Sequence, residues 1–262
     1  MKLNIVPAKQ GLVWVKLGIR TFWRQPLAFT GLFFLFMAWV SVLSLVPIIG
    51  SVIALFILPA ATLGLMVATE QAASGKFPMP TVLMVAFRAG QQRLKAMLVL
   101  GVLYALSFLA VMALTTLVDG GSFAKVYLAN APITPEVVDA ADFQMAIWLS
   151  TVLYIPMSMM FWHAPALVHW HGIPPVKSMF FSVVACWRNL GAFAVYLLAW
   201  AAVFVAGAAI ILTISSAVGG SDLTAAVLMP GALLMSAMFF TSVYFSVKDC
   251  FDLPSPGSEI QA

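Results

Sequence analysis

Three histidines are the residues of this chain best suited to metal chemistry, and they lie close together: His163, His169 and His171. Neutral imidazole binds transition metals, but a stable site needs further ligands that converge on the same ion. No cysteine or carboxylate lies near them in the sequence. We therefore interpret the histidines as groups that form hydrogen bonds near lipid headgroups, and we expect neither a metal nor another cofactor.

Three methionines precede the first histidine by about one to two turns of the same predicted helix: Met157, Met159 and Met160. Thioether sulfurs favour Cu(I), so a copper site is the alternative interpretation. The chain holds 15 methionines in a very apolar sequence, and methionine commonly fills gaps between packed helices. Packing is therefore the preferred role for these three.

The chain offers no recognisable catalytic constellation. No predicted span carries a charge in its central part, which argues against an ion-coupled pump. The spans contain no paired carboxylates, the serines lack a nearby base, and there is no glycine-rich phosphate loop. Polar groups inside the spans are expected to join helices or to line a cavity; they are Tyr104, Ser107, Ser150, Thr151, Tyr154, Tyr196 and Thr213. We predict that the protein is not an enzyme.

Composition identifies the class of protein. Hydrophobic residues make up 63% of the 262 residues and charged residues only 8%, with a mean hydropathy of +1.05. A soluble domain has about a quarter charged residues, so this chain cannot cover a water-facing surface and must be embedded in a membrane. The net charge of +4 comes from scattered residues, which argues against nucleic-acid binding.

Six apolar segments are long enough to span a bilayer: 27–45, 51–69, 96–118, 145–162, 190–215 and 223–247. Tight turns are expected at 46–50 and 218–222, and a longer connection over 119–143 with a short helix after Thr134. Pro59, Pro156 and Pro230 lie inside spans and predict bends. The tail over 248–262 is expected to be flexible.

Twelve of the 13 lysines and arginines fall before the first span, in 70–95, in 163–189 or in the tail, and only Lys125 falls on the other side. Loops rich in basic residues stay in the cytoplasm. The pattern therefore predicts a bacterial inner-membrane protein with both termini cytoplasmic. Cys186 and Cys250 fall on the same side and are expected to stay reduced.

Three amphipathic helices are predicted at this side, over 7–25, 81–95 and 175–189. In the last one, a helical projection separates an apolar set from a polar set. The apolar set is Val176, Met179, Phe180, Val183, Val184 and Trp187, and the polar set is Lys177, Ser178, Ser182, Arg188 and Asn189. The pattern indicates a helix lying in the headgroup plane, or else the packed end of an ordinary bundle helix.

The candidate contacts with lipid headgroups or with a partner are Arg24, Arg93, Lys177, Trp187 and Arg188. Anionic headgroups of the bilayer are the expected partners, with other membrane proteins as further candidates. Each amphipathic segment precedes a pair of spans, which predicts a threefold repeat over about 7–70, 78–162 and 174–247. The predicted fold is an all-α membrane bundle of six spans and three interfacial helices, forming one domain over 1–247.

Three stretches resemble a known family: QPLAFTGLFFLFM at 25–37, FWHAPALVHWHG at 161–172 and FFSVVACWRN at 180–189. The chain resembles an uncharacterised family of six-span inner-membrane proteins of Gram-negative bacteria over most of its length. It is more remotely similar to the membrane domain of bacterial glycerophosphodiester phosphodiesterases. Their soluble catalytic domain is absent, so the resemblance implies no phosphodiesterase activity and supplies no catalytic residues.

Three functions are compatible with these features. The first is a non-enzymatic structural or accessory module for membrane-complex assembly or envelope organisation. The second is a carrier or channel for a small apolar or amphipathic solute, with the proline bends around a cavity. A lipid-modifying enzyme ranks last because the sequence offers no catalytic constellation.

Overall fold

The computed structural model describes residues 2–218 and 221–253, with side chains over 2–215 and 226–253. Within these residues the chain is helical and forms no strand, apart from one isolated antiparallel bridge between Leu3 and Phe251. The predicted turn at 218–222 lies partly, and the tail from 254 onward wholly, outside the described residues.

The prediction of six spans is confirmed, because six helical segments are long and apolar enough to cross a membrane: Pro26–Ser44, Ile49–Ala73, Gln91–Asp119, Ala141–His171, Leu190–Ser215 and Ala226–Cys250. Pro59, Pro156 and Pro230 each lie inside a helix that continues past them. The bends expected at these prolines stay a prediction.

The chain forms two compact units, each assembled from segments far apart in the sequence. Unit 1 comprises Met1–Leu35, Gly64–Val85 and Ala185–Ala262, and unit 2 comprises Phe36–Leu63 and Ala86–Val184. Helices α2 (Pro26–Ser44), α3 (Ile49–Ala73) and α10 (Pro175–Arg188) contribute to both. The boundaries of the units differ from those of the predicted repeats.

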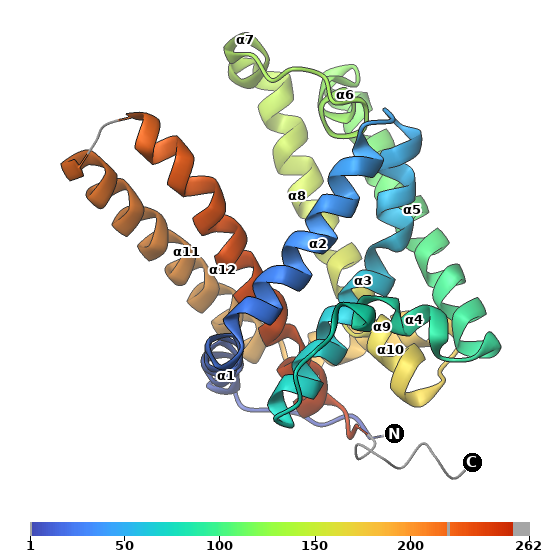
Figure 1. The fold of residues 1–262 in the computed structure, drawn as a ribbon. Helices are drawn as coiled ribbons and strands as arrows, with labels where there is room; N and C mark the ends of the chain where they lie inside the picture. Colours follow the sequence, from blue (N-terminus) through green and yellow to red (C-terminus); the bar gives the residue numbers. More distant parts are fainter. Residues whose placement is uncertain (1, 219–220, 254–262) are drawn as a thin grey trace. The chain divides into compact units, whose positions relative to one another are not determined.

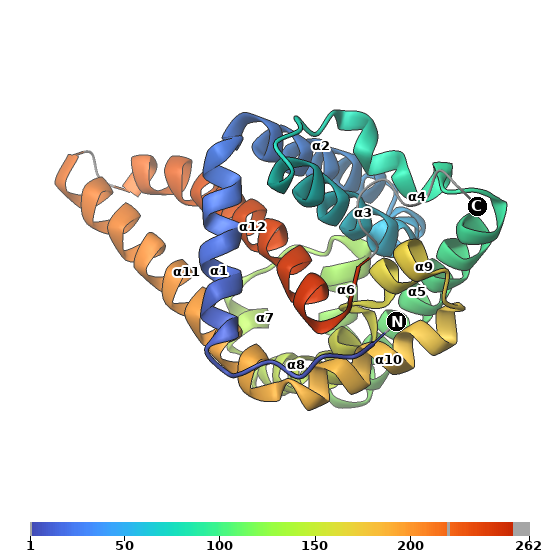
Figure 2. The same cartoon turned by 90° about the horizontal axis from the view of Figure 1, so that it is seen from below.

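In unit 1, helix α1 (Gln10–Arg24) packs across α11 (Leu190–Val218) and α12 (Ser221–Cys250) (Figure 2). Two glycines permit this close approach. A Cβ added at Gly11 would collide with the carbonyl of Ala192, and one added at Gly18 would collide with Ser242. The side of α1 that meets these helices also carries Trp14 and Phe22, both almost fully buried. Helix α1 is therefore a packed element of unit 1.

The core of unit 1 includes a group of aromatic residues around one hydroxyl. Ser242 on α12 lies 2.6 Å from the hydroxyl of Tyr196 and accepts the indole N–H of Trp200 at 3.1 Å. The Trp14 ring lies 5.9 Å from the Tyr196 ring, measured between centroids. Because buried Tyr and Trp need hydrogen-bond partners, Ser242 allows α1, α11 and α12 to share one aromatic core.

In unit 2, α5 (Gln91–Asp119) packs against α8 (Ala141–Phe161), and both contact α6 (Ser122–Ala129) and α9 (Ala164–His171) (Figure 1). Helix α6 was not predicted. Asp119 organises its start, because the carboxylate accepts the backbone N–H groups of Gly121 at 2.9 Å and Phe123 at 2.6 Å. The short helix expected after Thr134 is present as α7 (Pro135–Asp139).

The helix predicted over 81–95 is wrong in its extent. This stretch forms a 3-10 helix η1 (Pro80–Met84) and a single turn α4 (Val85–Arg88), and α5 then begins at Gln91. Gly90 separates them with φ at +89°, a conformation open mainly to glycine. At the other end of the chain, α12 continues to Cys250, past the end predicted at 247.

Candidate functional site

Helix α10 carries most of the predicted contact residues, and it turns its apolar stripe outward. Val176, Phe180 and Trp187 are 69%, 64% and 68% exposed. Ser178 and Ser182 are fully buried and Asn189, which follows the helix, is 2% exposed. Steps of about 100° per residue place these two sets on opposite sides. Three members of the predicted polar set, Ser178, Ser182 and Asn189, therefore lie on the buried side of the helix.

The buried serines of α10 form hydrogen bonds inside unit 2. The hydroxyl of Ser182 donates to the carbonyl of Met159 at 2.6 Å and accepts the backbone N–H of His163 at 2.9 Å. Both partners lie where α8 gives way to α9, where the helical hydrogen-bond ladder is interrupted. Ser182 therefore satisfies backbone groups that an apolar residue would leave unpaired in the interior.

Asn189, which follows α10 on the same buried side as the two serines, forms its hydrogen bonds inside unit 1. Its amide oxygen accepts the N–H of Val6 at 2.8 Å, and its amide nitrogen donates to the carbonyl of Asn4 at 3.1 Å. The Asn4 N–H in turn donates to the carbonyl of Cys250 at 2.9 Å. The segment over residues 2–9 is thereby tied to the ends of α10 and α12. We call it the N-terminal strap.

Asp249, at the end of α12, anchors the start of α1 beside this strap. One carboxylate oxygen accepts the side-chain N–H of Gln10 at 2.6 Å and the indole N–H of Trp14 at 2.7 Å. Sequence reasoning missed this role, because the partners lie 239 and 235 residues away. The only available signal was a carboxylate at the very end of the last span.

The predicted contact residues lie at accessible positions, divided between the two units. Arg24, Trp187 and Arg188 are exposed in unit 1. In unit 2, Lys177 is exposed, and Arg93 is half-buried in the first turn of α5.

One hydrogen bond extends the basic surface of unit 1. The side chain of Gln25 donates to the carbonyl of Lys76 at 3.2 Å. It thus joins the end of α1, where Arg24 lies, to a loop that exposes both Lys76 and Phe77. Sequence reasoning had assigned Lys76 only to a connecting loop, so this juxtaposition of two basic residues was not expected.

The histidines lie deeper than predicted. His163 is fully buried and His169 nearly so, and only His171 is half-buried. His163 and His169 are thus enclosed by protein and do not contact headgroups directly, and their level in the membrane stays a prediction. The described residues contain no group of three or more His, Cys, Asp or Glu that could hold a metal ion. Met157 is buried in α8.

Both cysteines are buried thiols. Burial, and to a lesser extent the neighbouring Cys250, raises the pKa of Cys186. A thiol with a raised pKa stays protonated and is a poor nucleophile or metal ligand. The backbone carbonyl of Cys186 accepts the N–H of Asn189 at 3.3 Å, which places this thiol beside the Asn189 hydrogen bonds.

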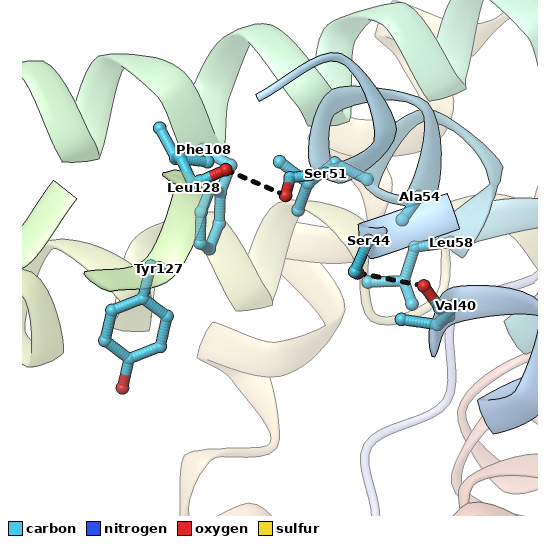
Figure 3. Close-up of a pocket in the computed structure, with 9 residues that line it drawn as sticks. Val40, Ser44, Ser51, Ala54, Leu58, Phe108, Tyr127 and Leu128 are labelled. Carbon is cyan, nitrogen blue, oxygen red and sulfur yellow. Dashed lines mark hydrogen bonds between the residues drawn. The ribbon is translucent and has the colours of Figure 1, made fainter. Parts of the chain in front are cut away.

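A cavity of about 220 Å³ lies in unit 2 (Figure 3). It is lined by residues of α2, α3, α5 and α6: Val40, Ser44, Ser51, Ala54, Leu55, Leu58, Phe108, Tyr127 and Leu128. Two of its hydroxyls already donate hydrogen bonds, Ser44 to the Val40 carbonyl at 2.9 Å and Ser51 to the Leu128 carbonyl at 3.1 Å. Sequence analysis could not place this cavity, because part of its lining belongs to α6, which was not expected.

Comparison with known proteins identifies a full-length relative. The chain is 40% identical over 261 residues to a protein of Burkholderia thailandensis named as a probable inner membrane protein, and the match covers 98% of this chain and 97% of the relative. No protein-family model and no solved structure matches the chain. The chain therefore belongs to the same family of multi-pass inner-membrane proteins as its Burkholderia relative.

Proposed function

We propose that the protein is a non-enzymatic accessory module of the inner membrane, with both termini cytoplasmic. Its cytoplasmic surface engages anionic lipid headgroups and so supports the assembly of membrane complexes or the organisation of the envelope. The observation that carries this proposal is the outward apolar stripe of α10, which exposes Val176, Phe180 and Trp187.

The composition of α10 suits the boundary between water and lipid. Tryptophan is enriched at this level, and the two exposed cations of the helix, Lys177 and Arg188, lie at its two ends. A basic residue near an anionic membrane surface contributes about 1 kcal/mol of attraction. The exposed apolar side chains would enter the acyl region while the cations stay among the phosphates.

Internal hydrogen bonds support a fixed orientation of this helix. Ser182 bonds to the corner between α8 and α9, and Asn189 bonds to the N-terminal strap. Rotating α10 to bury its apolar stripe would break both sets of bonds. The stripe is thus held outward by polar contacts within the protein, as expected for a surface that meets lipid.

The absence of enzymatic activity is part of the proposal. It rests on the sequence, where the spans carry no charge in their central parts and no nucleophile with a nearby base is recognisable.

A carrier for a small apolar or amphipathic solute is the second candidate function. The cavity in unit 2 favours it, because six of its nine lining residues are apolar and apolar ligands bind in such pockets. A carrier would bind a soluble probe in this cavity and move it across a sealed vesicle.

Native mass spectrometry of the purified protein tests the proposed function. The wild-type protein should retain phosphatidylglycerol in preference to phosphatidylethanolamine. Replacing Lys177 and Arg188 together by glutamine should reduce this preference by up to about 30-fold, which corresponds to two charges of about 1 kcal/mol each. Lys125→Gln is the matched control, because Lys125 is the one basic residue predicted on the opposite side.

Equal loss of phosphatidylglycerol in the Lys125→Gln control and in the double variant would contradict the proposal. Transport of a soluble amphiphile by the purified protein in sealed vesicles would favour the carrier instead.

A further inference from the structure

The cavity in unit 2 has a gradient of polarity along the membrane normal. Ser44 ends one candidate span, and Ser51 is the third residue of the next. Both are therefore at the membrane boundary, with Tyr127 of α6 beside them in the lining. Leu58 lies seven residues beyond Ser51 on α3, which is about 10 Å deeper at 1.5 Å per residue. The cavity therefore runs from a polar rim to an apolar interior.

The hydrogen bonds at the rim limit what the cavity can bind. The serine hydroxyls of Ser44 and Ser51 already donate to backbone carbonyls. The Leu128 carbonyl accepts twice, from Ser51 and from the N–H of Ile48 at 2.8 Å. Tyr127 is 57% exposed, and among the described residues its hydroxyl makes no hydrogen bond. The rim thus offers one unused donor above an apolar interior.

The rim is also fixed in shape. Ile48 has φ at +65°, a conformation that is unfavourable for a β-branched residue. Its N–H bond to Leu128 holds it there, and Asn130 donates to the Ser44 carbonyl at 2.7 Å. These bonds tie the turn between α2 and α3 to α6. A cavity that is already formed binds a ligand with less loss of conformational entropy.

We propose that this cavity binds one acyl chain of a membrane phospholipid, with the ester carbonyl at the rim accepting the hydroxyl of Tyr127. Seven of the nine lining residues belong to candidate membrane-spanning helices, so acyl chains surround them at high concentration. With a volume of about 220 Å³ the cavity is too small for a whole phospholipid, so the carbonyl-proximal part of one acyl chain occupies it. Figure 3 shows Tyr127 and Phe108 on one side of this space and Ala54 on the other. The inference does not depend on the proposed function.

A photoactivatable phospholipid tests this assignment in the full-length protein in nanodiscs. A diazirine near the carbonyl of the acyl chain should label peptides that contain 51–58 and 108, whereas a diazirine at the methyl end should not favour them. Ala54→Phe fills the cavity and should reduce this labelling at least fivefold. Ala113→Phe is the matched control, because Ala113 is an exposed residue of α5 outside the lining, and its labelling should equal that of the wild type.

Two further measurements keep the result interpretable. Ala54→Leu is a smaller plug for the case in which Ala54→Phe does not fold, and it should reduce labelling at least twofold. Tyr127→Phe should leave folding intact but shorten the retention of phospholipid in detergent. Labelling unchanged by both plugs, or spread evenly over all exposed helices, would overturn the inference. Labelling that is reduced when a soluble amphiphile competes before irradiation, but not when unlabelled phospholipid competes, would also overturn it.

Discussion

Replacing Asp249 by alanine should loosen the start of α1 and the N-terminal strap. The Asp249 carboxylate accepts hydrogen bonds from Gln10 and from the buried indole of Trp14. A hydrogen bond to a charged acceptor contributes about 1.5–3 kcal/mol. Because Asp249 is only half-buried, we take the lower value for each bond and expect a loss of about 3 kcal/mol.

Asp252 provides a matched control three residues further along the chain. It accepts a single hydrogen bond, from Asn4 at 3.1 Å, and that bond is exposed to solvent. Exposed polar contacts contribute about 1 kcal/mol or less. Asp252→Ala should therefore have little effect, although it removes the same charge from nearly the same place.

Hydrogen–deuterium exchange over residues 2–14 measures this difference. Exchange reports the free energy of local opening, and about 1.4 kcal/mol corresponds to a tenfold change in rate. Asp249→Ala should accelerate exchange of this segment by about 100-fold relative to the wild type, and Asp252→Ala by less than about tenfold. Equal exchange in the two variants would show that Asp249 does not anchor α1.

Three other predictions follow from burial and charge. Gly18→Ala should destabilise the protein by about 1–3 kcal/mol in denaturant unfolding, because its Cβ would collide within unit 1, whereas Gly31→Ala, with open space around it, should be neutral or stabilising. Cys186, whose pKa is raised by burial, should resist maleimide at pH 7–8 until the protein is unfolded in detergent. Reporter fusions at Ser122 and Ser258 should report periplasm and cytoplasm respectively, and the reverse result would refute the proposed orientation.

Hydropathy was sufficient to predict the six spans, because a bilayer demands long apolar segments whatever their neighbours. The start of α10 was also predictable, since Pro174 and Pro175 suit a first turn. Helix α6 was missed because its cause is local geometry. Gly121 adopts a positive φ and Asp119 supplies the bonds at the start of the helix, and neither effect produces a hydrophobic pattern.

The orientation of α10 could not be predicted from its pattern. In water an apolar stripe turns toward the protein core, but in a membrane it can equally face lipid. Which side of α10 faces the protein interior depends on hydrogen-bond partners elsewhere in the chain. Ser182 bonds to the backbone of His163, and Asn189 bonds to the N-terminal strap. The burial of His163 was not predicted for the same reason, since the sequence alone did not reveal which helices surround it.

The accessibility of spin labels along α10 tests the central claim most directly. Single cysteines would be introduced over 176–187 in a background with Cys186 and Cys250 replaced by alanine, and the protein reconstituted in nanodiscs. Collisions with oxygen, which concentrates in lipid, should peak at Val176, Phe180 and Trp187 and reach minima at Ser178 and Ser182. A flat profile dominated by collisions with a water-soluble reagent would contradict a lipid-facing stripe.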